Sequence, residues 1–309
     1  MSLVVETKNL SKHYNGFKAV EDLNLRISEG EIYGFLGPNG AGKTTTTLML
    51  LGLTEPTSGE VRVKGYNSTK EPQRVKRVTA YLPENVGFYE DLSAKRNLRY
   101  IAQLNGIPDR ESDGKIDNAL DKVGLKEVTD WEVRKFSKGM KQRLGMATVL
   151  IKEPVLAILD EPTAGIDPEG ARQILDLITK MSHEQGMTVL LASHLLYQVR
   201  QICDRVGIIS RGRLVAEGTI DKLGAEVLGG KTILDVRVSQ PSNELVESVN
   251  RMEGVSEVEL SGNLLRIKAN RDIRGAVSEA VMKSGSTLLE LKGQEYSLEE
   301  IYLKYFHGE

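Results

Sequence analysis

A glycine-rich loop with a lysine and a threonine is the feature of this sequence that most directly indicates chemistry. Residues 37–44 match the pattern GxxxxGK[ST], in which glycines let backbone N–H groups turn toward an anion. The ammonium of Lys43 can reach terminal phosphates, and the hydroxyl of Thr44 can ligate Mg²⁺. A buried strand is predicted at 31–36 and a helix at 44–51, the context that the pattern requires. The residues expected to contact phosphates are Gly37, Pro38, Asn39, Gly40, Ala41, Gly42, Lys43, Thr44 and Thr45.

A second group of candidate residues is acidic. The apolar run 155–159 predicts a buried strand, and Asp160 and Glu161 follow it directly. A carboxylate at the end of such a strand, beside a phosphate loop, holds Mg²⁺ directly or through water. A second carboxylate next to it can polarise an attacking water. The alternative is that the two acids only cap the next turn.

Three further segments carry polar residues at the ends of predicted elements. Ser137 and Gly139 open a helix that is predicted to run to about residue 151, and a helix N-terminus binds anions. The simpler alternative is that Ser137 is only an N-cap. Asp167 lies in a tight turn after the acidic pair. His194 follows the predicted strand 188–192; an isolated histidine there is more often structural, but parallel strand ends converge on one crevice.

The hydrophobic pattern predicts the elements that position these residues. Short alternating runs up to about residue 63 predict antiparallel strands that flank the loop-bearing strand. The period then becomes helical over 93–134. Further along, continuous apolar runs alternate with helical segments, which predicts a parallel sheet covered on both faces. The predicted strands are 155–159, 188–192 and 206–209, and the predicted helices between them are 169–185 and 195–203.

A second, smaller domain is predicted after a glycine-containing linker at 224–231. Residues 232–309 show the order β-α-β-β-α-β, followed by a last helix with a capping box at Ser297 and Glu300. This order is that of a ferredoxin-like α+β domain. No cluster of chemistry-bearing residues occurs in it. Its order suits small-molecule sensing or subunit pairing, but a stabilising dimer contact is the more economical interpretation.

Composition limits the class of protein. With 309 residues the chain is long enough for two domains. A net charge of −2 argues against non-specific binding of nucleic acid, which would need a basic face. The single cysteine, Cys203, excludes an internal disulfide and lies in an apolar-periodic segment typical of a buried position. The start of the sequence shows no signal-peptide pattern. No apolar run approaches the 20 or so residues that a spanning helix needs, so at a membrane another polypeptide would do the spanning.

In their order and spacing, the motifs in residues 3–220 resemble the nucleotide-binding subunit of ATP-binding-cassette (ABC) transporters. The resemblance implies an α/β fold of the P-loop NTPase class over 1–223. This cassette has a mixed RecA-like core, an antiparallel β subdomain and an α-helical subdomain at about 93–152. A small α+β ferredoxin-like domain follows at 232–309.

The resemblance also implies roles for individual residues. Glu161 is the general base, Asp160 serves Mg²⁺, and His194 is the switch histidine. Tyr14 lies where the family has an aromatic side chain that stacks on adenine. Ser137 and Gly139 correspond to the signature that contacts the γ-phosphate of ATP on the partner subunit, and Asp167 to the D-loop. The implied cofactors are ATP and Mg²⁺.

Two positions depart from the family pattern. The family usually has glutamine after the strand 78–82, where this chain has Glu84, which can still ligate a cation but adds negative charge near phosphates. The signature contains Lys138, which either contacts phosphate or is merely solvated. Both features, with the small carboxy-terminal domain, are similar to the branch of the family that exports drugs, polysaccharides, haem-related cargo or ions.

The resemblance also implies specific partners. The chain is expected to dimerise around two Mg-ATP, with itself or with a paralogous ATPase, and to drive a separate transmembrane permease subunit. It would lie on the cytoplasmic face of the cell membrane and bind no nucleic acid. One alternative is a soluble ATPase of the superfamily that acts on ribosomes or DNA. Another is a regulator that binds ATP without turnover, which the presence of Glu161 and His194 disfavours.

Overall fold

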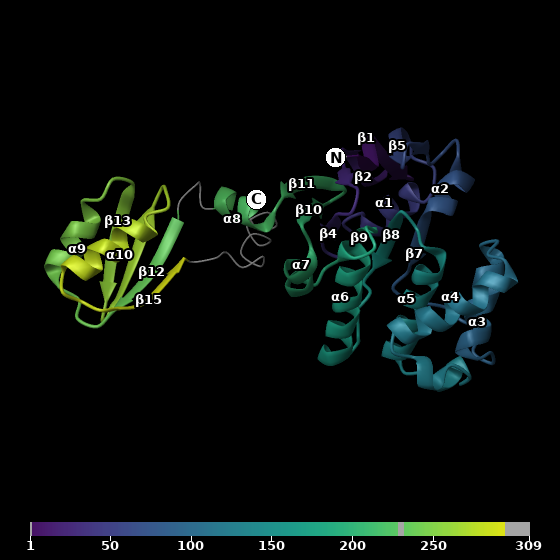
Figure 1. The fold of residues 1–309 in the computed structure, drawn as a ribbon. Helices are drawn as coiled ribbons and strands as arrows, with labels where there is room; N and C mark the ends of the chain where they lie inside the picture. The colour runs from purple at the N-terminus through teal and green to yellow at the C-terminus, as the bar shows by residue number, and fades with distance from the viewer. Residues whose placement is uncertain (1, 228–231, 294–309) are drawn as a thin grey trace. The chain divides into compact units, whose positions relative to one another are not determined.

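The structure is a computed structural model that describes residues 2–227 and 232–293. The chain divides into two compact units, Met1–Gly218 and Thr219–Glu309, and each is described by itself. Figure 1 labels the helices and strands of both units.

A six-stranded sheet forms the centre of the first unit, with the strand order β11-β10-β4-β9-β8-β7. Five strands run parallel, and β11 is antiparallel to β10. Every residue of β4, β8 and β9 is buried, as expected for a parallel sheet covered on both faces. The predicted parallel sheet is therefore confirmed. The strands are β4 (Ile32–Leu36), β7 (Thr79–Leu82), β8 (Leu156–Asp160), β9 (Thr188–Ser193), β10 (Arg205–Ser210) and β11 (Arg213–Gly218).

The register of this sheet brings three strand ends together. Leu36 at the end of β4 pairs with Ser193 at the end of β9, and Asp160 at the end of β8 pairs with Ala192. The phosphate loop follows β4, so it begins at the same edge as the acidic pair and the predicted switch histidine. The helices that follow these strands are α1 (Lys43–Leu50), α6 (Pro168–His183) and α7 (Leu196–Ile202).

The amino-terminal strands form a sheet of their own. Its order is β2-β1-β5-β6, with β3 paired to β1, and all pairs are antiparallel. These strands were predicted to flank β4; instead their apolar faces pack against it in one hydrophobic cluster that includes Leu10, Val61 and Phe35. The strands are β1 (Leu3–Tyr14), β2 (Phe17–Leu23), β3 (Arg26–Ser28), β5 (Ser58–Val63) and β6 (Tyr66–Asn67), with helix α2 (Pro72–Val78) after them.

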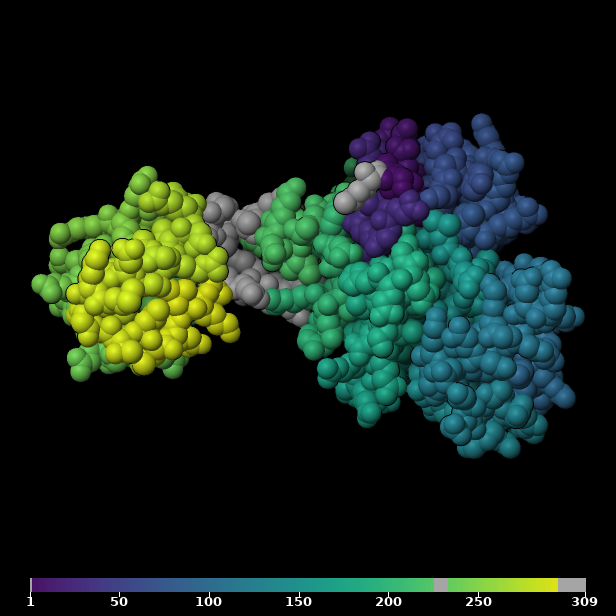
Figure 2. Space-filling view, in the orientation of Figure 1, coloured from purple at the N-terminus to yellow at the C-terminus, as the bar shows by residue number. Residues whose placement is uncertain are grey.

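A helical segment follows β7. The space-filling view shows it as a lobe beside the rest of the first unit (Figure 2). Ser93 caps its first helix through the N–H of Arg96, and Pro108 and Gly124 flank the second helix. The breaks expected from the sequence at these two residues are therefore present. The elements are α3 (Ala94–Leu104), α4 (Asp109–Lys122), the 3₁₀ turns η1 (Lys126–Val128) and η2 (Val133–Lys135), and α5 (Lys138–Lys152).

The second unit contains a four-stranded antiparallel sheet in the order β13-β14-β12-β15. Two helices interrupt the strands in the predicted order β-α-β-β-α-β. Their apolar residues, such as Leu245 and Val277, pack with Val236 and Ile267 of the sheet in a separate core. The elements are α8 (Ile220–Val227), β12 (Thr232–Val238), α9 (Asn243–Asn250), β13 (Val255–Ser261), β14 (Leu264–Ala269), α10 (Arg274–Lys283) and β15 (Leu288–Gly293).

Two expectations about the second unit need comment. Part of the predicted linker 224–231 is helical, because α8 extends to Val227. The predicted last helix, with Ser297 and Glu300, lies outside the described residues. None of the helices in residues 2–227 and 232–293 combines the length and hydropathy that crossing a bilayer requires.

Candidate functional site

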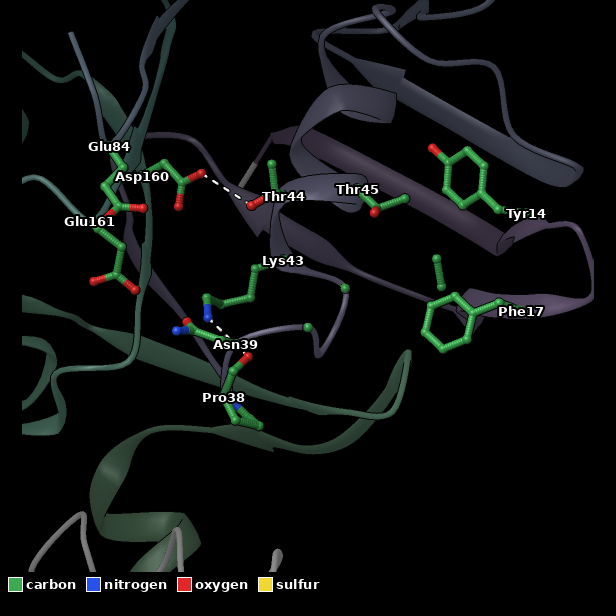
Figure 3. Close-up of a pocket in the computed structure, with 13 residues that line it drawn as sticks. Tyr14, Phe17, Pro38, Asn39, Lys43, Thr44, Thr45, Glu84, Asp160 and Glu161 are labelled. Carbon is green, nitrogen blue, oxygen red and sulfur yellow. Dashed lines mark hydrogen bonds between the residues drawn. The ribbon is translucent and has the colours of Figure 1, made fainter.

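The glycine loop forms one wall of a cavity of about 310 Å³ (Figure 3). The loop needs its glycines, since Gly40 and Gly42 have φ values of +80° and +109°. A Cβ on Gly42 would lie 2.5 Å from the carbonyl oxygen of Ala19. The cavity is lined by Tyr14, Phe17, Ala19, Pro38, Asn39, Gly40, Gly42, Lys43, Thr44, Thr45, Glu84, Asp160 and Glu161.

Lys43 supplies a buried cation to this cavity. Its Nζ donates to the carbonyl oxygen of Gly37 at 2.6 Å and to that of Pro38 at 3.2 Å. Burial lowers the pKa of Lys43, and the negative charges of Glu161 and Asp160 oppose that shift. The loop thus holds the ammonium of Lys43 in the cavity. A cation in this position can pair with the phosphates of a ligand.

Thr44 and Asp160 form a candidate site for a divalent cation. Thr44 Oγ1 donates to Asp160 Oδ2 at 3.3 Å, and the Tyr81 hydroxyl lies 3.5 Å from the same oxygen. Burial raises the pKa of Asp160, and the neighbouring charge of Glu161 adds to the rise. In the described ranges, no group of three or more His, Cys, Asp or Glu side chains is arranged to hold a metal. One hydroxyl and one carboxylate suit Mg²⁺, which takes its remaining ligands from water and substrate phosphates.

Glu161 is strongly positioned. Its backbone is left-handed, with φ +49°, a conformation that costs a non-glycine residue about 1–3 kcal/mol. Its Oε1 accepts from the backbone N–H of His194 at 2.9 Å and lies 2.7 Å from His194 Nδ1. Its Oε2 accepts from Ser193 Oγ at 3.0 Å. Residues from the end of β9 therefore fix a buried carboxylate at the edge of the cavity.

The residues expected to form the signature and the D-loop, Ser137, Gly139 and Asp167, lie outside this cavity lining. Ser137 Oγ accepts from the N–H of Met140 at 3.2 Å, so Ser137 caps α5. Asp167 Oδ1 accepts from the N–H of Gly170 at 2.9 Å and caps α6. A Cβ on Gly139 would lie 3.4 Å from Ile166 Cγ2, so the two helix starts adjoin. Both capping residues are exposed, and we call Ser137, Gly139 and Asp167 together the signature surface.

Several cavity residues were not predicted from the sequence. Phe17, Ala19, Tyr81 and Ser193 contribute to the cavity or to its carboxylates. For Phe17 a signal exists, because an Asn-Gly turn at 15–16 would have placed it opposite Tyr14. Tyr81 and Ser193 depend on the direction of side chains at strand ends, and Ala19 carries no chemical signal.

Comparisons with known proteins agree on one family. The family model described as "ABC transporter" matches residues 20–164. The bacitracin transport ATP-binding protein BcrA of Bacillus licheniformis is 37% identical over all of this chain and 99% of its own length. The linearmycin resistance ATP-binding protein LnrL of Bacillus subtilis is 34% identical, with 97% of each chain covered. A solved ATP-binding subunit of an ABC transporter is 32% identical, with a TM-score of 0.67 over 73% of this chain and 93% of that one.

The chain belongs to the ABC transporter family, as an ATP-binding subunit. The family and the P-loop NTPase fold expected from the motifs are confirmed. As an ABC cassette, the protein binds and hydrolyses ATP for a transporter. The relatives named above are transport and resistance proteins, which leaves the alternative of a ribosome- or DNA-acting ATPase without support.

Proposed function

We propose that this ABC subunit hydrolyses Mg-ATP in the cavity at residues 37–44 and thereby drives export by a separate permease. The observation that carries the proposal is the convergence of Lys43, Thr44, Asp160 and Glu161 on one cavity. Export is supported by the relatives, since one is a resistance protein by name.

In this proposal each cavity residue has one task. Lys43 leaves the loop carbonyls that it now contacts and pairs with the terminal phosphates of ATP. Thr44 and Asp160 hold Mg²⁺, which when bound neutralises developing charge on the phosphates. Glu161 accepts a proton from the attacking water. His194, whose Nδ1 lies 2.7 Å from that carboxylate, orients it and responds to the presence of the terminal phosphate.

We further propose that a second cassette, a copy of this chain or a paralogous ATPase, completes the site. Ser137 and Asp167 of the signature surface are exposed, and none of its three residues lines the cavity of its own chain. The helix start at Ser137 presents backbone N–H groups that favour an anion. Face-to-face dimerisation would therefore bring Ser137 and Gly139 to the γ-phosphate on the partner.

A groove of about 280 Å³ between the end of β7 and helices α3 and α5 supports contact with a permease. Within the described part of the chain, Lys152 of this groove has no hydrogen bond or ion pair, and burial lowers its pKa. Exposed Tyr100 and Leu104 adjoin the groove residues Ile101, on α3, and Asn105, which caps the end of that helix. An acidic helix of a membrane subunit would cover the apolar surface and pair with the lysine. In our proposal the protein therefore works on the cytoplasmic face of the membrane.

Co-purification tests the proposed function. Tagged Glu161→Gln protein, pulled with Mg-ATP from gently solubilised cells of the source organism, should bring down a polytopic membrane protein at stoichiometric yield. Lys152→Glu in the same background should lose that partner and keep nucleotide binding. Ribosomal proteins or DNA in place of a membrane protein would contradict the proposal.

For the carboxy-terminal unit we propose a stabilising role at the dimer contact. It has its own hydrophobic core, which supports independent folding of both units. Deletion of residues 232–309 should weaken dimerisation while leaving ATP binding by the single cassette. Dimerisation that survives the deletion unchanged would exclude a stabilising role at the dimer contact.

A further inference from the structure

The segments that follow β8 and β9 are joined at two successive points. The two strands are parallel neighbours, and Glu161 and His194 follow their ends. Glu161 Oε1 lies 2.7 Å from His194 Nδ1, which is the first point. Further along both segments, the hydroxyl of Thr163 donates a hydrogen bond to Oε1 of Gln198, which is the second. The second bond has no part in the tasks proposed above.

The backbone at Glu161 needs an anchor on each side. Its φ of +49° is left-handed, and a non-glycine residue keeps such a conformation only where the surrounding structure holds it. On one side, the N–H of Glu161 donates to the carbonyl oxygen of Ala192 at 2.9 Å. On the other side, Thr163 is only 2% exposed, and its buried hydroxyl finds its partner in Gln198. The Thr163–Gln198 bond therefore helps to hold the backbone from which the proposed base projects.

Gln198 comes from a helix that is fixed on the core of the first unit. It lies in the first turn of α7, where its backbone N–H donates to the carbonyl oxygen of Leu195 at 3.2 Å. The next residue, Val199, is fully buried, and a Cβ on Gly34 of β4 would lie 2.6 Å from Val199 Cγ1. Packing this close leaves the helix little room to move on the sheet. Gln198 thus connects the backbone after Glu161 to the strand that leads into the phosphate loop.

We propose that Gln198 is a positioning residue for ATP hydrolysis, which holds Thr163 and thereby the backbone that aims the carboxylate of Glu161 at the attacking water. This inference rests on the proposed role of Glu161 as the base. Neither Gln198 nor Thr163 lines the nucleotide cavity, so binding of Mg-ATP should not depend on them. The rate should, because a displacement of about 1 Å at a reacting group can cost about 100-fold.

Phosphate release at saturating Mg-ATP, combined with calorimetric binding of Mg-ATP, tests the proposal. Gln198→Leu removes the acceptor, so turnover should fall by about 10- to 100-fold while the affinity for Mg-ATP stays unchanged. Thr163→Val should do the same, and Thr163→Ser, which keeps the hydroxyl, should retain most of the turnover. Gln201→Leu, at an exposed position of the same helix, is the matched control and should change neither quantity.

The double variant Gln198→Leu/Thr163→Val separates positioning from a purely structural role. Gln198→Leu alone leaves a buried hydroxyl unpaired and should lower the melting temperature, whereas removal of both polar groups should restore much of it. Turnover should nevertheless stay as low as in the single variants, because all three lack the bond. Turnover that recovers together with the melting temperature would overturn the inference. So would near-normal turnover of Gln198→Leu, or a loss of Mg-ATP affinity in proportion to the loss of turnover.

Failure of this inference and failure of the proposed function give different results. In the Glu161→Gln background the base is absent, so Gln198→Leu should cause no further loss of turnover. A further loss of about 10-fold or more would mean that Gln198 acts by another route and would overturn the inference. Near-normal turnover of Glu161→Gln by itself would instead contradict the proposed function.

Discussion

The cavity and the signature surface place similar polar residues in opposite surroundings. In the cavity, Asp160 and Glu161 are buried, hydrogen-bonded and, for Glu161, held in a left-handed backbone. On the signature surface, Ser137 and Asp167 are exposed, and the side chain of each caps its own helix. The first group is held by contacts within one chain, whereas in residues 2–227 and 232–293 the side chains of the second group accept hydrogen bonds only from their own helix starts. This contrast supports our proposal that each subunit contributes its cavity to one composite site and its signature surface to another.

Removal of the base should give the largest effect. Glu161→Gln keeps the shape of the side chain but cannot accept a proton, so ATP turnover should fall by about 10²–10⁴-fold while Mg-ATP affinity is retained. Phosphate release under saturating Mg-ATP measures this. Glu259→Gln, on the solvent-exposed strand β13, is the control and should hydrolyse normally. Near-normal turnover by the first variant would remove Glu161 from its role.

A matched change at Ser137 separates the two interpretations of the signature surface. Aspartate caps helices as well as serine does, so Ser137→Asp should preserve α5 and stability. It also brings a negative charge to the point where a partner's γ-phosphate is expected, and such like-charge contact costs several kcal/mol. Turnover should therefore drop by about 30-fold or more. If turnover is unchanged while the protein is folded, Ser137 is only an N-cap.

The two lysines near these regions should behave differently. Lys43→Ala removes a charge-assisted contact to phosphate and should weaken Mg-ATP binding to the single cassette by about 10- to 150-fold. Lys138→Ala should leave that affinity unchanged, because Lys138 is exposed and outside the cavity lining. Titration with Mg-ATP in the Ser137→Asp background, which should not form the ATP-dependent dimer, compares them. Equal losses in both variants would contradict the separation of the two regions.

The departure at Glu84 should have a smaller effect that depends on Mg²⁺. Glu84 lines the cavity, and its negative charge raises the pKa of Lys43. Glu84→Gln removes one negative charge, so metal-free ATP should bind up to about 5-fold more tightly, corresponding to ~1 kcal/mol. With Mg²⁺ the gain should shrink, since the cation offsets the charge. The same gain in EDTA and in Mg²⁺ would show that Glu84 does not sense the metal.

The smallest expected effect concerns pKa values of buried and exposed carboxylates. Burial raises the pKa of Asp160, whereas Arg274 lowers the pKa of exposed Asp272 to about 2. Asp272 thus stabilises the fold above pH ~4, and this stabilisation is lost as the pH falls toward about 2. The contribution of Asp160 to stability has the opposite sign, because burial disfavours its charged form. The free energy of unfolding therefore falls as the pH rises from ~4 through the raised pKa of Asp160. Carboxyl NMR titration without nucleotide measures both, and equal pKa values would contradict the contrast.

Much of the cavity could be predicted from the sequence because its chemistry depends on local motifs. The glycine loop needs a fixed spacing, and apolar strands that end in Asp160 or precede His194 place those residues at one sheet edge. The order of the second unit was likewise readable from its periodicity. These features are set within short segments.

Other features depend on contacts between segments far apart in the sequence. Tyr14 and Phe17 pair across the turn between β1 and β2, yet they line the cavity together with residues that follow the distant strands β4 and β8. The hydrogen bond from Ser193 to Glu161 depends on the register between β8 and β9. The separation of Ser137 from the cavity depends on where the helical lobe packs. Each of these contacts joins two distant segments, so the residue pattern within one segment does not predict it.

The mass of the Glu161→Gln protein in solution tests the central claim most directly. In Mg-ATP, light scattering should report about twice the 34.1 kDa of one chain, because uncleaved γ-phosphates would join each cavity to the signature surface of a partner. In Mg-ADP the mass should be that of one chain. Adding Ser137→Asp should abolish the ATP-dependent dimer without abolishing ATP binding. A protein that binds ATP stoichiometrically yet keeps the mass of one chain would contradict the composite site.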